Sequence, residues 1–199
     1  MDIIGRARER EALMRCEASD KSELVCVYGP LRVDKTYLVS QTLSPYVAFH
    51  VVGSKRETTR EQLRQFGFEL AKCGDSNPQS PTTWREVFRR MYKVVSAVEA
   101  PKSPHGKAVI FIDEFPWFCE QRSDFLSAFA QFWNRWSMVG QLLLVIVCGS
   151  DTSWVEENIL WNCDDLAARV NESYYVEPLA DTDSECVSTT MAVNGAGRR

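Results

Sequence analysis

Glu23-Leu24-Val25-Cys26-Val27-Tyr28, followed by Gly29-Pro30-Leu31-Arg32-Val33-Asp34-Lys35-Thr36, is the stretch that decides the fold of this chain of 199 residues. Its first part is a short apolar run that stops at a glycine, which predicts a buried strand ending in a loop. Residues 36–43 follow in helical register. The stretch therefore predicts a strand, a loop and a helix in immediate succession.

The loop, Gly29 to Thr36, matches the phosphate-loop pattern, GxxxxGK followed by Ser or Thr, with one mismatch. In such a loop the backbone N–H groups and the helix amino terminus hold phosphates, the lysine reaches the outer phosphates, and the hydroxyl binds Mg²⁺. Lys35 and Thr36 suit those two roles. The predicted nucleotide-binding residues are Gly29, Pro30, Leu31, Arg32, Val33, Asp34, Lys35, Thr36 and Tyr37.

The mismatch is Asp34, which stands where the pattern has glycine. Asp tolerates a left-handed backbone better than most residues, so strain alone costs about 1 kcal/mol. Charge has the larger effect, because a carboxylate about 5 Å from a phosphate is repelled by roughly 3 kcal/mol at an effective dielectric of about 20, on the order of a hundredfold in affinity. Bound Mg²⁺ would offset part of this repulsion. The alternative is a loop that no longer binds nucleotide.

Residues 109–114, Val-Ile-Phe-Ile-Asp-Glu, have the form of a Walker B strand, in which an apolar run ends in two acids. Such a strand buries itself and brings both carboxylates to the nucleotide. We expect Asp113 to support the Mg²⁺ ion and Glu114 to orient or deprotonate the attacking water. The position downstream of a phosphate loop favours this function over a strand that merely ends in solvated acids.

Ser150 follows the most hydrophobic segment of the chain, residues 142–148. A small polar side chain at the end of that strand is placed to sense the terminal phosphate of a nucleotide. It is equally placed to cap a helix that runs from Ser153 onward. The residues alone leave both roles open.

The whole chain alternates apolar strands with helices, which indicates an α/β fold with a mostly parallel sheet covered on both faces. Polar residues gather after the strands, where active sites of such sheets lie. The expected strands are 23–28, 46–52, 108–112, 142–148 and 174–176. The expected helices are 36–43, 58–72, one from Thr83 with the apolar stripe Trp84, Val87, Phe88, Met91, Val94, Val95 and Val98, and one capped by Ser123 that ends at Gly140. The helix capped by Ser123 carries Phe125, Phe129, Phe132, Trp133 and Trp136, a stripe typical of a core.

The composition of the chain limits the partners and the cellular compartment that we expect for it. The formal net charge of −4 indicates no general attraction to nucleic acid, and the alternating charges of Arg6, Arg8, Glu9, Arg10, Glu11 and Arg15 predict a solvated helix face. No apolar run approaches the ~20 residues that cross a bilayer, and no signal peptide opens the chain, so we expect no membrane and a cytoplasmic protein. The scattered cysteines, without a CxxC pair, are expected to be reduced thiols.

Five segments of the chain carry a resemblance to a known family. They are Ile3-Ile4-Gly5-Arg6 with Glu9, Val27 to Val39, Ile112-Asp113-Glu114-Phe115-Pro116-Trp117, Phe132-Trp133-Asn134, and Val147-Cys148-Gly149-Ser150 with Trp154. The chain resembles the prokaryotic AAA-type ATPases related to the STAND class. The resemblance implies a P-loop NTPase three-layer sandwich of the additional-strand type, with five strands and the phosphate-loop strand at the sheet centre. It also implies ATP and Mg²⁺ as ligands and Ser150 as a sensor. It places Arg169 where the family usually has an arginine before its last core strand, which makes Arg169 a candidate catalytic residue. Three roles stay open for this arginine: contact with phosphate in cis, contact with phosphate in trans, or a pair with a surface acid.

The chain departs from that family at Asp34 and at its end. Where the family continues into a helical lid, this chain has a Ser-, Thr- and Gly-rich stretch. We therefore expect an ATPase core over residues 1–180, an irregular tail over 181–199 and no lid. Mg-dependent ATP binding, with hydrolysis if the site is active, is the leading hypothesis. The alternatives are a non-catalytic interaction module with a protein partner, or a truncated fragment, and oligomerisation stays open.

Overall fold

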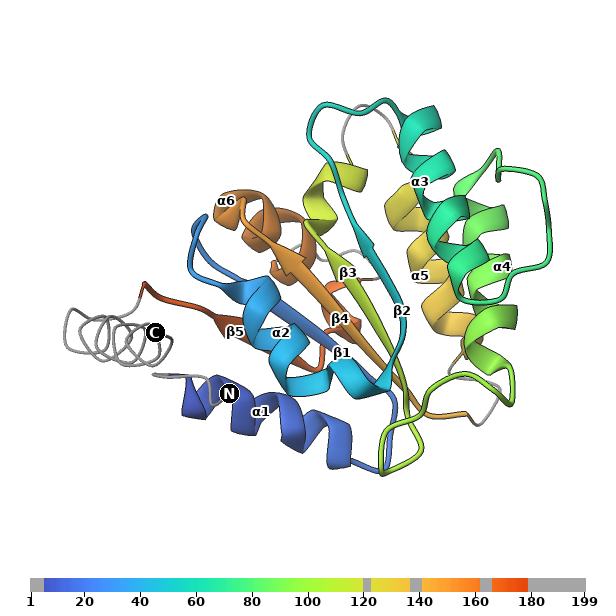
Figure 1. The fold of residues 1–199 in the computed structure, drawn as a ribbon. Helices are drawn as coiled ribbons and strands as arrows, with labels where there is room; N and C mark the ends of the chain where they lie inside the picture. The colour runs from blue at the N-terminus through green and yellow to red at the C-terminus, as the bar shows by residue number, and fades with distance from the viewer. Residues whose placement is uncertain (1–5, 120–122, 137–140, 162–165, 179–199) are drawn as a thin grey trace, which may run out of the picture.

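The computed structural model describes residues 6–119, 123–136, 141–161 and 166–178. A five-stranded, all-parallel sheet lies between two layers of helices (Figure 1), which confirms the predicted α/β three-layer fold. None of the described helices is long and apolar enough to cross a membrane. The predicted tail, the question of a lid and the helix end at Gly140 fall outside the described residues.

The strand order in the sheet is β2-β3-β4-β1-β5. The strands are β1 (Glu23–Tyr28), β2 (Val47–Val52), β3 (Ala108–Asp113), β4 (Leu143–Gly149) and β5 (Glu172–Tyr175). The middle place belongs to β4, whereas β1 lies between β4 and β5. The expectation that the phosphate-loop strand occupies the centre is therefore wrong by one position. All strands run the same way, so their carboxyl ends meet at one edge.

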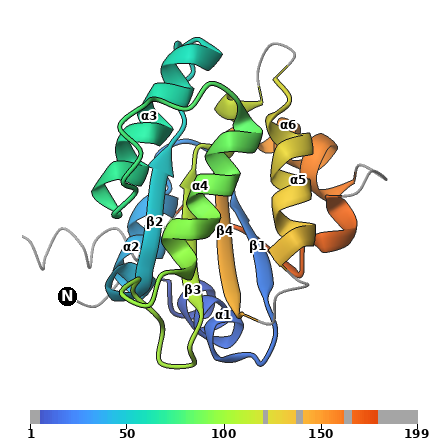
Figure 2. The ribbon, with the colours of Figure 1, turned by 90° about the vertical axis from the view of Figure 1, so that its right-hand side faces the viewer.

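Helices α1 (Ala7–Ala18) and α2 (Lys35–Leu43) cover one face of the sheet, and α3 (Thr59–Lys72), α4 (Trp84–Ser96) and α5 (Phe125–Trp136) cover the other (Figures 1 and 2). On the second face lie also the short helix α6 (Thr152–Val155) and the π-helix η3 (Glu156–Leu160). Side chains of β1, β3 and β4 are buried on both faces. Their continuous apolar sequence follows from that double burial.

The aromatic stripe of α5 is core, as predicted. Its five rings are all buried in the cluster under α3, α4 and α5. Phe125 stacks on Phe118 with ring centroids 5.0 Å apart, and it meets Trp84 edge to face at 4.8 Å. Contacts of this kind stabilise a core beyond the area they bury, so the stripe is not available to stack on nucleobases.

The predicted helix starts are confirmed by their caps. Thr58 and Glu61 form a reciprocal capping box at the start of α3, and the Ser123 hydroxyl accepts from Phe125 N at 3.2 Å. At α4, Thr83 Oγ1 accepts from Glu86 N at 3.2 Å, but the Glu86 carboxylate bonds to Thr82 N at 3.0 Å instead of to Thr83. The cap there is shared between two threonines.

Two boundaries, the end of α4 and the start of β5, differ from expectation by two residues. Helix α4 ends at Ser96 because Ala97 has extended backbone angles (φ −59°, ψ 147°), so Val98 leaves the predicted stripe and is 94% exposed. Strand β5 begins at Glu172 instead of Tyr174, because Asn171 pins the chain to β1. Asn171 N donates to Leu24 O at 2.9 Å, and Leu24 N donates to Asn171 Oδ1 at 2.8 Å. Because the strand begins with the polar residues Glu172 and Ser173, the apolar pattern did not predict its start.

Candidate functional site

The predicted site residues gather where the parallel strands end. Tyr28 is in register with Gly149, and Ile112 with Val147, so the residues that follow β1, β3 and β4 emerge side by side. These residues are the loop from Gly29, the acids Asp113 and Glu114, and Ser150. Elements far apart in the sequence thus place one set of polar side chains at one edge.

The loop after β1 turns sharply through residues with positive φ. Gly29 has φ +149°, and a Cβ there would lie 2.4 Å from Val176 O, just past β5. Arg32 and Asp34 follow with φ 66° and φ 59°. Asp34 therefore adopts the left-handed conformation (ψ 31°) that suits the glycine of the pattern, directly before α2. Its side chain is exposed and makes no cap hydrogen bond, so the mismatch changes charge rather than backbone shape.

Lys35 folds back into the loop. Its Nζ donates to Gly29 O at 3.0 Å and to Pro30 O at 2.7 Å, and the residue is only 6% exposed. Burial lowers the pKa of Lys35 because the ammonium is desolvated, and the carboxylates of Glu114 and Asp113 offset part of that shift. A desolvated ammonium that is hydrogen-bonded to neutral carbonyls is well prepared to receive an anion.

Thr36 and Asp113, the two predicted metal residues, are in direct contact. Thr36 Oγ1 donates to Asp113 Oδ2 at 2.5 Å, and Asp113 Oδ1 accepts from Glu114 N at 2.9 Å. Asp113 is 3% exposed. One hydroxyl and one carboxylate are the oxygen donors that Mg²⁺ takes from a protein when phosphates and water supply the rest. No larger set of His, Cys, Asp or Glu that could hold a metal occurs among the described residues.

Glu114 and Ser150 form a second short pair. Ser150 Oγ donates to Glu114 Oε1 at 2.5 Å, within the range of a charge-assisted hydrogen bond. Glu114 has φ 49°, and its other oxygen, Oε2, is buried without a hydrogen-bond partner among the described residues. The alternative role of Ser150 as a helix cap is wrong, because Asp151 caps α6 by accepting from Trp154 N at 3.1 Å.

Comparison with known proteins supports the architecture. No protein-family model and no curated protein sequence matches the chain. Among solved structures, a Walker-type ATPase of Pyrococcus abyssi is similar with a TM-score of 0.66 and 17% identity, over 100% of this chain and 61% of that one. The ORC2 protein of Aeropyrum pernix, in ADPNP and ADP complexes, has a TM-score of 0.63 at 12% identity, over 96% and 53%.

DnaA of Aquifex aeolicus bound to AMPPCP is also similar, with a TM-score of 0.56 and 12% identity over 96% of this chain and 51% of that one. The chain has the P-loop NTPase fold. At these identities the likeness establishes the fold alone. The chain spans between half and about three-fifths of the length of the structures it matches.

Arg6 contacts the phosphate loop, Gly29 to Thr36 (the P-loop), and the charge pattern did not predict this contact. It was expected on a solvated face with Arg8, Arg10 and Arg15, and those three are exposed. Arg6 instead is 6% exposed, and its Nη2 donates to Val33 O in the P-loop at 3.3 Å and to Glu177 O at 2.6 Å. The reason is its place immediately before α1, outside the helical period. The only sequence signal for it was the segment Ile3-Ile4-Gly5-Arg6.

Arg169 lies away from the P-loop. It ends the 3₁₀ helix η4 (Ala167–Arg169), just before β5. Because Glu172 is in register with Val25, near the start of β1, Arg169 lies toward the amino ends of the strands. The P-loop leaves β1 at the opposite end, so a contact between Arg169 and a phosphate in the same chain has no support in this arrangement.

The remaining predicted nucleotide-binding residues differ in exposure. Gly29 and Val33 are buried and Pro30 is half-buried. Leu31 and Tyr37 are 70% and 43% exposed. Leu31 lies in the loop and Tyr37 in the first turn of α2, and both side chains are open to solvent.

Proposed function

We propose that this chain binds ATP together with Mg²⁺ at the P-loop and hydrolyses it to ADP and phosphate. The observation that carries the proposal is the convergence of three polar units at the carboxyl edge of the sheet. These units are the buried Lys35, the Thr36–Asp113 pair and the Glu114–Ser150 pair. Two of the similar structures, ORC2 and DnaA, are nucleotide complexes, and the common fold supports the same ligand class here.

Binding would rest on the loop and Lys35. The backbone N–H groups at the amino terminus of α2 face the region where phosphates are held in such loops. The Lys35 ammonium would exchange its carbonyl partners, Gly29 O and Pro30 O, for phosphate oxygens. Its burial makes that exchange favourable, since a charge–charge contact replaces contacts with neutral groups.

The metal site fits the residues present. Thr36 Oγ1 and Asp113 Oδ2 already lie 2.5 Å apart, and both are hard oxygen donors. Bound Mg²⁺ would neutralise charge that develops on the phosphates. In our proposal Thr36 binds the ion directly, Asp113 supports it through water, and the hydrogen bond from Glu114 N keeps Asp113 in place.

Hydrolysis would rest on Glu114. Its carboxylate is placed to orient a water molecule and take its proton while the water oxygen attacks the terminal phosphorus and the bond to ADP breaks. Ser150 holds Oε1, which leaves Oε2 for the water. Because Oε2 is buried, the side chain must turn before it can reach water.

Asp34 weakens this proposal less than its charge suggests. The Asp34 side chain is exposed, so solvent screens its repulsion of a phosphate. In bulk water two unit charges at about 4 Å interact by only about 1 kcal/mol, compared with about 4 kcal/mol at an effective dielectric of about 20. We therefore place the penalty nearer the aqueous value, with weakened rather than absent binding.

A second candidate function is a non-catalytic interaction module with the ATPase fold. It is favoured by the Asp34 carboxylate and by Glu114, whose oxygens are bound to Ser150 or buried. In that case the chain would signal or assemble without turnover. Arg169 could contact phosphate only in the P-loop of another copy of the chain, because in its own chain it lies toward the amino ends of the strands. For either function we infer a reducing, cytoplasmic setting, supported by the free thiols of the described cysteines.

Magnesium dependence tests the proposal. The purified chain is titrated with a fluorescent ATP analogue in Mg²⁺ and again in EDTA. Tighter binding in Mg²⁺, together with phosphate release from ATP, is the expected result, since Thr36 and Asp113 provide a metal site. Binding without phosphate release supports the non-catalytic module. Binding that is indifferent to Mg²⁺ contradicts the assignment of Thr36 and Asp113.

A further inference from the structure

A groove of about 480 Å³ runs between α4 and α5, on the face of the sheet opposite to α2, the helix that follows the P-loop. Figure 2 shows the two helices side by side over the sheet. The cations that line the groove are Arg85, Arg89 and Lys93 on α4 and Arg135 on α5, and all four are exposed. Among the described residues that line it, none is acidic.

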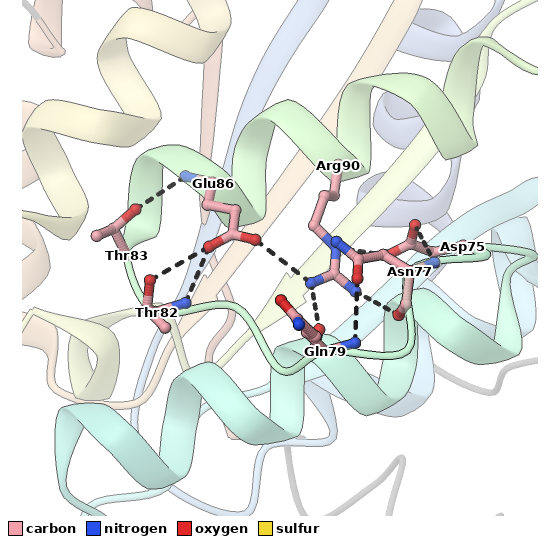
Figure 3. Close-up of polar contacts among 7 residues, drawn as sticks. All are labelled: Asp75, Asn77, Gln79, Thr82, Thr83, Glu86 and Arg90. Atoms are coloured by element: carbon pink, nitrogen blue, oxygen red, sulfur yellow. Dashed lines mark hydrogen bonds and ion pairs between the residues drawn. The ribbon is translucent and has the colours of Figure 1, made fainter.

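Of the four cations of α4, Arg90 is buried and hydrogen-bonded, whereas the other three are exposed. Arg90 is 3% exposed and fully engaged (Figure 3): Nε contacts Asp75 Oδ2 at 2.5 Å, Nη1 donates to Gln79 O at 2.7 Å, and Nη2 donates to Asn77 O at 3.1 Å. Arg90 therefore fastens the loop between α3 and α4. The three groove cations of α4 make no hydrogen bond or ion pair within the described part of the chain.

The spacing of those three cations is unfavourable for the helix itself. Arg85, Arg89 and Lys93 follow one another at four-residue intervals, so they form an uninterrupted like-charge ladder along one side of α4. Each such pair destabilises an isolated helix by about 0.2–0.5 kcal/mol, and a glutamate at the middle position would reverse the sign. The chain as a whole has more acids than bases. Glu86, the only acid of α4, accepts from Thr82 N and lies 3.7 Å from Arg90 Nη1 instead. A partner that supplies negative charge accounts for a ladder with no acid paired to it on the helix.

The floor of the groove is apolar. Phe88 on α4 and Ala128 and Phe132 on α5 are buried there. Tyr92, half-buried against Trp136 with ring centroids 5.0 Å apart, is the most accessible apolar side chain of the floor. An apolar floor between rows of charge matches the way an amphipathic helix lies in a groove, with its apolar side chains inward and its charges on the rim. We propose that this groove binds an acidic amphipathic segment of a partner protein.

Nucleic acid fits the groove less well. Stacking on successive bases needs several exposed ring faces, and of the three rings in the groove only Tyr92 is more than 6% exposed. The net charge of −4 also opposes a long polyanion at a distance, whereas a short segment with a few carboxylates meets mainly the local cations. The apolar floor would contribute nothing to a contact with phosphates.

The test uses the full chain and a labelled synthetic peptide that forms a helix with a leucine stripe flanked by glutamates. Fluorescence anisotropy is followed for the wild type and for Arg89→Ala/Lys93→Ala. The double variant Arg60→Ala/Arg64→Ala is the matched control, because it removes the same charge at the same spacing from exposed positions on α3. We expect the α4 variant to bind roughly five- to tenfold more weakly and the α3 variant to bind within about twofold of the wild type.

Several results would overturn the proposal. One is equal binding by the wild type and the α4 variant, or no binding of the peptide at all. Another is equal binding of a peptide with glutamine in place of every glutamate. Tighter binding of short double-stranded DNA, lost in the α4 variant, would make the groove a nucleic-acid site. A dimer of the free chain that dissociates in the α4 variant would make it a self-interface. Circular dichroism melts of both variants show whether they fold.

Discussion

Lys35→Ala is expected to cause a large loss of ATP affinity. The substitution removes the buried ammonium that would contact the outer phosphates, and a loss of about 3 kcal/mol corresponds to a decrease in affinity of roughly a hundredfold. Stability should change little, because a desolvated charge held by Gly29 O and Pro30 O contributes little net free energy to folding. Titration with a fluorescent ATP analogue in Mg²⁺ measures the affinity, and thermal unfolding measures the stability.

The matched control is Lys21→Ala. Lys21 carries the same charge but lies before β1, at the opposite end of the sheet, with a 64% exposed side chain. Its removal should leave the ATP affinity unchanged. If Lys35→Ala binds ATP as tightly as the wild type, the nucleotide does not lie in the P-loop in the manner proposed.

Glu114→Gln is expected to stop ATP turnover while leaving ATP binding nearly intact. The amide keeps the size of the side chain and can still accept the hydrogen bond from Ser150, so the local structure is preserved. It cannot take a proton from water. Loss of a general base lowers turnover by roughly a hundredfold to ten-thousandfold. Phosphate release under saturating ATP measures this effect, with binding measured in parallel.

Glu157→Gln serves as the control for that prediction, because Glu157 is an exposed acid in η3. It makes no hydrogen bond or ion pair within the described residues. Its replacement should leave turnover unchanged. Turnover that survives in Glu114→Gln would show that another group activates the water.

The sequence was sufficient for the parts of the fold that bury continuous apolar runs. Residues 23–28 were predicted as a strand with the bounds that β1 has, and β3 and β4 differ by a single residue at their ends. Caps fixed the starts of α3, α4 and α5, since Thr58, Thr83 and Ser123 accept local backbone hydrogen bonds. A strand buried on both faces and a capped helix both leave a local signal in the residues themselves.

The sequence was insufficient where distant contacts decide. Arg6 is buried by Val33 O and Glu177 O, which lie 27 and 171 residues away along the chain. The pairing of Ser150 with Glu114, rather than with the helix that follows it, depends on the adjacency of β3 and β4. The groove cations were also hidden, because a helix pattern does not reveal which faces of two helices meet. In each case the deciding partner comes from another element.

Titration of the wild-type chain with Mg²⁺ and a fluorescent ATP analogue, beside Asp34→Gly, tests the proposed function most directly. Asp34 already has the backbone conformation that glycine takes, so the substitution removes charge without reshaping the loop. We predict that the wild type binds and that the glycine variant binds more tightly, by roughly tenfold for about 1.4 kcal/mol of relieved repulsion. Binding by neither protein at millimolar nucleotide would contradict an ATP site in this chain, and binding by the glycine variant alone would contradict its function in the natural sequence.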